Sequence, residues 1–349
     1  MKGWMGKFKA LFIFGLIALV LTGCGEPNLS ALQPKGEGAE TLYDLMMLSI
    51  YVMVGVFLVV MTIYTFVLIR YRQKKGQEDF IPEQKEGNHL LEIVWTVIPI
   101  LLLLVLAVPT VITTFELADA EPPADQAEDA IVIQVTGKQF WWHFNYENEE
   151  IQTSQDMYIP TDTRVYLKLR SDDVIHSFWL PSIAGKMDAN PGGNENKMTL
   201  LAYEEGVYEG KCTEFCGDSH SLMDFKVIAV SPEEYEDWVS GMKAESADEK
   251  PETTTALEGQ QLFQEKSCIG CHAVDAGSQV QTGPNLTNFG NRSKVAGFTD
   301  NTKENVVEWL SDPQDVKPGN KMPNVGLTEE EASKIADYLQ QLKIDDENE

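Results

Sequence analysis

The sequence predicts a membrane protein of several domains. A hairpin of two transmembrane helices comes first, a β-sandwich or barrel follows, and a small helical domain ends the chain. Two long runs without charge, a region of alternating β-type pattern and a last region with helical periodicity predict this order. The 349 residues are enough for two domains or more.

Residues 1–23 are typical of a secretory signal peptide of the lipoprotein type. Lysines at the start precede an apolar run from Ala10 to Leu21, which is too short to span a membrane comfortably. Leu-Thr-Gly-Cys at 21–24 resembles a bacterial lipobox, which implies cleavage before Cys24 and a lipid on its sulfur. An uncleaved anchor with an incidental cysteine is the alternative.

Two transmembrane helices are expected at residues 42–70 and 91–115. Their uncharged cores, 45–69 and 93–115, both exceed the roughly 20 residues that cross a bilayer. An exterior N-terminal segment at 24–41 would precede the first helix. A soluble buried helix is the weaker interpretation, because neither run has a polar face at helical spacing.

The charges that flank the helices predict their orientation. Basic side chains gather where the first helix ends, which places the loop at 71–90 in the cytoplasm; they are Arg70, Arg72, Lys74 and Lys75. The hairpin therefore puts the N-terminus and everything after residue 116 on the exterior face. This agrees with the signal peptide, which is independent evidence.

The whole chain is strongly acidic. It has 27 Lys and Arg against 54 Asp and Glu, a formal charge of −27. That balance, without any basic patch, argues against nucleic-acid binding. It favours attraction of a positively charged protein partner.

Short β-type runs fill residues 131–230 of a domain expected at 131–240, after a Pro-Pro and acid-rich linker at 116–130. Val165, Leu167 and Leu169 alternate with polar neighbours, as in half-buried strands. About a hundred residues of this kind make a sandwich or a barrel.

A cluster of metal-ligating side chains lies near the end of this region. Cys212, Cys216, His220 and Met223 fall within twelve residues, and thiolate, imidazole and thioether ligands favour copper over hard ions. The second thiolate can bridge, so we infer two copper ions, with His176 as the second imidazole. A disulfide between the two cysteines is the alternative, but it leaves the His and Met spacing unexplained.

Residues 241–255 have almost no large apolar side chains and are predicted to be a tether. The domain at 256–349 contains Cys268, Cys271 and His272 as Cys-x-x-Cys-His, the attachment signature of c-type haem. Met322, in a polar loop, is the expected second axial ligand. A redox-active or zinc-binding Cys pair is the alternative, and the final His and the export of the domain argue against it.

Helices are expected at 256–267 and 302–311 and after Thr328. Glu331, three residues beyond Thr328, completes a capping box. The residues that follow at helical spacing predict a single buried face; they are Ala332, Ile335, Ala336, Leu339 and Leu342.

The motif Cys-x-Glu-x-Cys-x-x-x-His-x-x-Met, preceded by His-Ser-Phe-Trp-Leu-Pro, resembles the binuclear copper (CuA) site of cytochrome c oxidase subunit II. With the haem motif, the chain is most similar to the haem-c-fused (caa-type) bacterial form, and the resemblance covers nearly all residues. It implies a cupredoxin-like Greek-key β-barrel and an all-α class I cytochrome c domain. Gly283-Pro284-Asn285-Leu286 resembles the loop behind the haem histidine in such cytochromes.

The resemblance also assigns roles to two acidic residues. It implies that the backbone carbonyl of Glu214 faces copper and that its side chain reaches a magnesium shared with subunit I. Without the resemblance, the sequence favours a solvated surface acid at Glu214. The resemblance likewise implies that Glu92, in Glu-x-x-Trp-Thr-x-x-Pro, lies at the mouth of a proton channel formed with subunit I, whereas the sequence alone favours an interfacial acid.

One position departs from the family pattern. In the family an aromatic residue over the copper site, usually Trp, takes electrons from external cytochrome c, and here Phe140 stands at that position. The departure fits a chain that carries its own donor. His143, in the same aromatic stretch, is expected to be an ordinary polar residue.

These features predict subunit II of a membrane-bound terminal oxidase. Electrons from cytochrome c would pass the haem and the copper pair to subunit I for oxygen reduction coupled to proton translocation. Expected partners are subunit I, further membrane subunits and membrane lipid. The alternatives are the copper subunit of a nitric-oxide-type or nitrous-oxide reductase and a copper-carrying assembly protein. A quinol oxidase subunit would be expected to lack the Cys pair.

Overall fold

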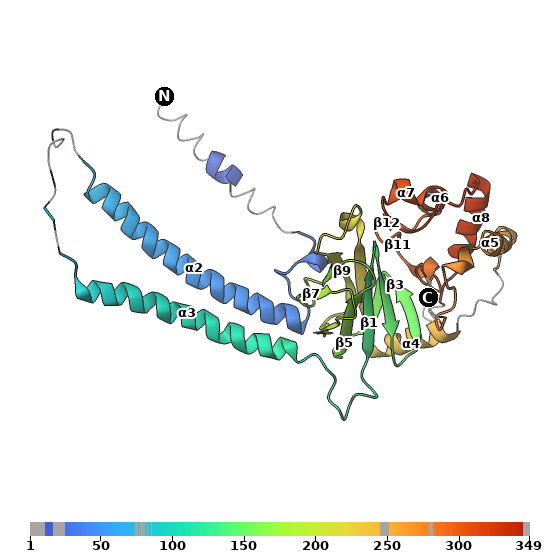
Figure 1. Ribbon diagram of the computed structural model, residues 1–349, viewed down its shortest axis with the longest axis horizontal. Helices are drawn as coiled ribbons and strands as arrows, with labels where there is room; N and C mark the ends of the chain where they lie inside the picture. The colour runs from blue at the N-terminus through green and yellow to red at the C-terminus, as the bar shows by residue number, and fades with distance from the viewer. Residues whose placement is uncertain are drawn as a thin grey trace. The chain divides into compact units, whose positions relative to one another are not determined.

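The computed structural model describes residues 11–16, 25–73, 76, 81, 83–84, 86–244, 251–278 and 282–344 (Figure 1). Of the predicted signal peptide only 11–16 is described, and this stretch is helical. The predicted cleavage site and Cys24 lie outside the described residues. The chain divides into two compact units, residues 40–119 and the remainder, and each is described by itself.

Two long helices, α2 (Glu37–Arg70) and α3 (His89–Ala118), make up the first unit almost entirely. Both are long and apolar enough to cross a membrane, as expected. α3 begins three residues before Glu92, and Asn88 caps it by accepting hydrogen bonds from the amides of Leu90 and Leu91 at 3.0 and 3.2 Å.

Two five-stranded sheets form the core of the second unit. In spatial order the first sheet consists of β3 (Ile151–Ser154), β2 (Trp141–Tyr146), β1 (Val132–Lys138), β5 (Val165–Ser171) and β8 (Asn196–Leu200). The second consists of β4 (Asp156–Pro160), β10 (Asp224–Val230), β9 (Gly206–Cys212), β6 (His176–Trp179) and β7 (Lys186–Ala189). β1 pairs with β5 and β4 with β10 in parallel, and the other pairs are antiparallel.

Aromatic side chains from both sheets fill the space between them. The ring of Phe178 stacks on that of Phe225 with centroids 4.1 Å apart, and Trp142 meets both rings edge-on. Val165, Leu167 and Leu169 are fully buried, which confirms the alternation predicted for that strand. This core fixes the ends of β6, β9 and β10, where the metal-ligating residues lie.

Helix α4 (Pro232–Ala244) follows the last strand and covers β3 and β4. Its Trp238 stacks on Tyr158 with centroids 4.8 Å apart, and Met242 is fully buried. The helix therefore extends four residues into the segment expected to be a tether. The expectation was wrong for residues 241–244. The sequence around Met242 is polar, and only the folded β domain provides the apolar core in which this side chain is buried.

The C-terminal domain is mostly helical, orange to red in Figure 1. Its helices are α5 (Thr254–Glu265), α6 (Lys303–Ser311), α7 (Pro313–Val316) and α8 (Glu329–Leu339), with a short ladder of β11 (Lys294–Val295) and β12 (Thr299–Asp300). The short 3-10 turns of the chain are η1 (Pro27–Leu29), η2 (His220–Leu222), η3 (Cys268–Gly270) and η4 (Phe289–Asn291).

Helices α5 and α8 pack against each other. A Cβ at Gly259 would lie 1.9 Å from the carbonyl oxygen of Lys334, so only glycine allows this approach. The predicted capping box of Thr328 and Glu331 is present. Of the predicted apolar face, Ala332, Ile335, Ala336 and Leu339 are buried in α8, whereas Leu342 lies beyond the end of the helix and is half-buried.

Candidate metal centre and haem pocket

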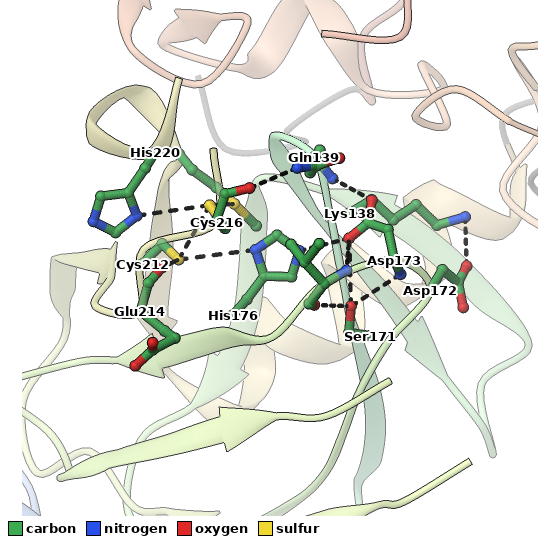
Figure 2. Close-up of polar contacts among 12 residues, drawn as sticks. Lys138, Gln139, Ser171, Asp172, Asp173, His176, Cys212, Glu214, Cys216 and His220 are labelled. Carbon is green, nitrogen blue, oxygen red and sulfur yellow. Dashed lines mark hydrogen bonds and ion pairs between the residues drawn. The ribbon is translucent and has the colours of Figure 1, made fainter. Parts of the chain in front are cut away.

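The loop between β9 and β10 carries two cysteines whose sulfur atoms lie 3.9 Å apart. Nδ1 of His220 lies 3.6 Å from Cys216 Sγ, and Sδ of Met223 lies 3.8 Å from the same sulfur. His176, the first residue of β6, places its Nδ1 3.9 Å from Cys212 Sγ. The fold thus gathers the five side chains predicted to bind metal. Figure 2 shows His176, Cys212, Cys216 and His220 among them.

The two sulfurs are free thiols. Their separation of 3.9 Å is far beyond the ~2 Å of a disulfide bond, so the disulfide alternative is not supported. The hydrogen bond from Cys216 is the main cause that lowers the pKa of Cys212, to about 3. The same contact raises the pKa of Cys216. One proton therefore leaves the pair easily, and the second leaves only against the negative charge of the first.

A cation bound by the two sulfurs would make loss of the second proton easier, because it stabilises both thiolates at once. The donor set consists of two thiols, two imidazoles and a thioether, which are the ligands that copper prefers. The carbonyl oxygen of Glu214 also lies close, 3.4 Å from Cys212 Sγ. The residues present therefore fit a copper pair.

His176 is held from its far side by a carboxylate. Its Nε2 lies 2.8 Å from Oδ1 of Asp173, so the ring spans the gap between Asp173 and the Cys212 sulfur (Figure 2). Burial lowers the pKa of His176, but the hydrogen bonds with Asp173 and Cys212 outweigh it and raise the pKa. Burial raises the pKa of Asp173, but the hydrogen bonds with His176, Gln139 and Lys321 outweigh it, and its pKa falls well below the usual range.

The ring of His176 also packs directly against the backbone of β1 at Gly137. A Cβ at Gly137 of β1 would lie 2.7 Å from Cδ2 of His176, so glycine is needed there. Trp142 touches the ring edge-on, with centroids 5.8 Å apart. Sequence reasoning missed both Asp173 and Gly137. The only signal for the former is its position three residues before His176.

The Glu214 side chain does not join the sulfur cluster. The residue is exposed, and Figure 2 shows its carboxylate pointing away from the two sulfurs. Phe215 beside it is 78% exposed, although it is aromatic. This edge of residues 212–223, which we call the copper loop, is therefore open to a partner surface.

A second site lies in the helical domain, where Cys268, Cys271, His272 and Met322 line one apolar pocket. The pocket has about 1170 Å³ of free space, counting its mouth open to solvent. Phe263, Leu286, Leu310 and Ile335 are among its apolar walls. Two thiols, an imidazole and a thioether around an apolar pocket fit a covalently attached haem.

His272 is oriented for a metal. Its Nδ1 lies 2.9 Å from the carbonyl oxygen of Pro284, and donation there leaves Nε2 as the free nitrogen. Burial lowers the pKa of His272, which keeps the imidazole neutral. A Cβ at Gly283 would lie 2.6 Å from Cε1 of the ring. The Gly283–Pro284 loop therefore backs this histidine, as the sequence resemblance implied.

Side-chain amides fix the loop that carries Met322. Asn320 accepts a hydrogen bond from the Met322 amide at 2.7 Å, and Gln314 donates to the Met322 carbonyl at 3.0 Å. Gln139, Phe140 and Trp141 of the β domain line the same pocket. Gln139 in addition donates from Nε2 to the carbonyl oxygen of Cys216 at 2.5 Å, so one side chain lies at both sites. Sequence reasoning did not find this bridge.

The remaining candidate, Glu92, lies in the first turn of α3. Its Oε2 is 3.5 Å from Nδ1 of His89, which is fully exposed. His143, expected to be an ordinary polar residue, is instead buried in β2 and 9% exposed.

Three family descriptions match the chain in order. "Cytochrome C oxidase subunit II, transmembrane domain" matches residues 29–112, and "Cytochrome C oxidase subunit II, periplasmic domain" matches 149–230. "Cytochrome c" matches 256–343. Cytochrome c oxidase subunit 2 of Alkalihalophilus pseudofirmus is 49% identical over 346 residues, which is 99% of each chain. This chain belongs to the cytochrome c oxidase subunit II family.

Other relatives agree with that membership. Cytochrome c oxidase subunit 2 of Bacillus subtilis is 44% identical over 97% of this chain and 98% of its own length. Quinol oxidase subunit 2 of Bacillus spizizenii is 35% identical over 68% of this chain and 74% of its own length. The full-length similarity to cytochrome c oxidase subunits supports the predicted function over the reductase and assembly-protein alternatives.

Family membership also confirms several predicted properties. The chain is a subunit II with a cupredoxin-like domain that implies CuA copper and a fused cytochrome c domain that implies haem c. It is a two-pass membrane protein with an extracellular C-terminal region. Subunit II proteins associate with subunit I and other oxidase subunits, so the oxygen-reducing centre belongs to a partner.

Proposed function

We propose that this subunit II accepts electrons from cytochrome c at its own helical domain and delivers them through the β domain to subunit I. A copper pair and a covalent haem would each supply one-electron redox chemistry. The observation that carries the proposal is Gln139, which lines the pocket around His272 and also donates to the carbonyl of Cys216. The two sites are thus joined by one residue of the chain.

The copper ligands in this proposal are His176, Cys212, the Glu214 carbonyl, Cys216, His220 and Met223. Electron transfer is fast when ligands hardly move on a change of charge, and these residues are held by packed strands. His176 has Asp173 behind it, and the loop closes on itself through the Met223 amide, which donates to the His220 carbonyl at 3.2 Å.

In the helical domain, Cys268 and Cys271 would form the thioethers, while His272 and Met322 would hold the iron. Methionine with histidine raises the reduction potential of a haem. The backbone carbonyl of Pro284 and the side chain of Asn320 fix these two residues. The domain boundaries that follow are 131–240 for copper and 256–349 for haem, with α4 reaching into the segment between them.

The acidic charge of −27 supports a basic donor such as cytochrome c. Glu214, which is exposed, would give its carboxylate to a magnesium shared with subunit I, and Glu92 would take up protons at a channel mouth. A mature N-terminus on the exterior face, with lipid on Cys24, would complete the two-pass arrangement. The roles of Glu214 and Glu92 follow from the family resemblance, whereas the orientation and the lipid on Cys24 follow from the flanking charges and the lipobox-like sequence.

The test is to purify the oxidase from membranes and compare it with the variant Cys216→Ser. We expect the parent to contain two copper ions and one haem c per chain and to consume oxygen with reduced cytochrome c. Cys216→Ser should lose the paramagnetic copper signal and more than about 90% of turnover but keep its haem c, because the bridging thiolate is gone. Full copper content in this variant would refute the copper assignment.

A further inference from the structure

The segment from Lys317 to Met322 runs from the β domain to the haem pocket. It begins at a lysine that contacts β-domain backbone and ends at the methionine proposed to bind iron. Between them, Pro318 and Lys321 each contact a β-domain residue that supports a copper ligand. We call residues 317–322 the docking segment.

Lys317 is 2% exposed, which is unusual for a lysine. Its Nζ donates to the carbonyl oxygen of Phe140 at 2.7 Å and to that of Ala296 at 2.7 Å. The first carbonyl belongs to the β domain and the second to the helical domain. One buried amino group therefore ties the two domains together, and its loss would leave two carbonyls without their donor.

The next contact reaches the copper loop itself. Ser219, the residue before His220, is 1% exposed and donates from Oγ to the Pro318 carbonyl at 2.6 Å. Gly319 follows with a φ of +75°, and a Cβ there would lie 3.2 Å from Oδ2 of Asp218. A side chain at residue 319 would therefore be strained by the positive φ and would press against Asp218 of the copper loop.

The last contact of the docking segment reaches Asp173, the residue that holds the imidazole of His176. Lys321 pairs with Oδ2 of Asp173 at 2.9 Å, and the other oxygen of Asp173 holds His176. Lys321 is 55% exposed, so this ion pair contributes little energy. The ion pair nevertheless holds Lys321, the residue before Met322, against Asp173. Lys317 is the buried anchor of the segment, and Lys321 is its exposed end.

We propose that Lys317 is a positioning residue that anchors the Met322 loop on the copper loop, and that electron transfer within the chain depends on this anchor. The proposal rests on the metal and haem assignments made above, but the docking itself involves only this chain's residues. A haem domain held in this way works from one fixed position and not as a freely swinging carrier. Electron transfer then requires no search for the acceptor.

Other contacts join the two domains through residues outside the docking segment. The backbone amide of Gln152 donates to the Ala276 carbonyl at 2.9 Å, and Ile344 packs into the β-domain core. Both lie away from the Met322 loop in sequence. Loss of Lys317 should therefore loosen the docking segment more than it loosens the rest of the domain.

Amine footprinting of the intact oxidase tests the docking without any variant. Burial lowers the pKa of Lys317 to about 7, so a Lys317 that became accessible would regain an ordinary pKa and react like other surface lysines. We expect it instead to react with an amine-directed ester at least about tenfold more slowly than Lys303 or Lys321, since reaction requires the interface to open. Reaction of Lys317 as fast as Lys303 would overturn the proposal.

The variant Lys317→Met tests the consequence, with Lys303→Met as the matched control. Lys303 pairs with Asp337 at 2.6 Å inside the helical domain and touches no β-domain residue in that pair. A protease site inserted between α4 and α5 allows the domains to separate after cleavage. We expect Lys317→Met to release the helical domain about tenfold more readily than the control, because two buried carbonyls lose their donor.

The uncut variant supplies the functional measurement. Turnover with reduced cytochrome c should show a lower kcat for Lys317→Met and an unchanged KM, because the donor meets the helical domain and only the internal step is impaired. The proposal would be overturned if Lys317→Met kept the cut helical domain as well as Lys303→Met does and had the same kcat.

Failure of the metal assignments would look different. In that case the intact protein would lack the copper or haem spectrum while Lys317 stayed protected from the ester. If Lys317→Met fails to fold, the footprint of the parent protein still decides the docking.

Discussion

Asp173 and His176 form a carboxylate–imidazole pair in which Oδ1 lies 2.8 Å from Nε2, on the opposite side of the ring from Cys212. The carboxylate fixes which nitrogen of the ring is free to face the sulfurs, because Nε2 must carry the proton that it shares with Asp173. Asp173 therefore sets both the tautomer and the basicity of the imidazole. Asp173 binds no metal in the proposed site, but it sets the tautomer and basicity of the proposed ligand His176.

The variant Asp173→Asn should weaken that ligand while the side chain keeps its shape. We expect copper to be retained about 10- to 100-fold less tightly, because partners of ligating histidines have effects of this size. The reduction potential of the copper site should rise, since a negative charge that stabilises the oxidised form is removed. Copper retention against a chelator and a spectroscopic redox titration measure the two effects.

Asp172→Asn is the matched control for this change. Asp172 is the preceding acid, pairs with Lys138 at 2.8 Å and does not touch His176 in that pair. It should hold copper like the parent. Equal chelator resistance in both variants would mean that Asp173 does not act through the imidazole.

Gly283 allows close contact behind the histidine of the haem pocket. In Gly283→Ala the new methyl group would lie 2.6 Å from Cε1 of His272, so the ring or the loop must move. We expect fewer chains to attach haem and a melting temperature lowered by several degrees, which corresponds to about 1–3 kcal/mol of overpacking. The haem content per chain and thermal melting of the holo protein measure this.

Gly277→Ala provides the comparison for that prediction. A Cβ at Gly277 would meet Oδ1 of Asp275 only at 3.5 Å, an ordinary contact, in the same domain. Haem content should therefore match that of the parent. If Gly283→Ala also attached haem normally and melted like Gly277→Ala, the close approach would carry no cost.

Most of the proposed metal ligands could be named from the sequence because they lie close together along the chain. Cys212, Cys216, His220 and Met223 share one loop, and Cys268 and His272 share one turn, so residue type and spacing were enough. Thr328 and Glu331 likewise cap α8 through contacts three residues apart.

The supporting residues could not be predicted because their roles depend on distant parts of the chain. Lys317 donates to the carbonyl of Phe140, which is 177 positions away in the chain. Gln139 reaches Cys216 across 77 positions. Met242 sits in a polar stretch, and only the packed sheet shows that α4 continues to it. Sequence periodicity carries no signal for such contacts.

His143 should make the β domain sensitive to acid. Burial is the main cause that lowers its pKa from 6.5 to about 4, and the nearby charge of Lys138 adds to the effect. The unfolded chain therefore binds a proton below pH 6.5 that the folded chain refuses until about pH 4, so stability falls as the pH falls through this window. A shift of this size corresponds to a loss of at most about 3 kcal/mol between pH 7 and pH 4.

The variant His143→Phe should remove that loss. Nδ1 of His143 has no hydrogen-bond partner among the described residues, and the ring contacts Trp141 edge-on, so an apolar ring can take its place with the loss of one hydrogen bond to the Thr153 backbone. We expect its stability at pH 7 to lie within about 1 kcal/mol of the parent, and its melting temperature to fall less between pH 7 and pH 4.5. His89→Phe, at a fully exposed position, should keep the acid sensitivity of the parent. Parallel pH dependences for the parent and His143→Phe would show that the acid loss comes from other groups, because a buried neutral histidine requires the two curves to diverge below pH 6.5.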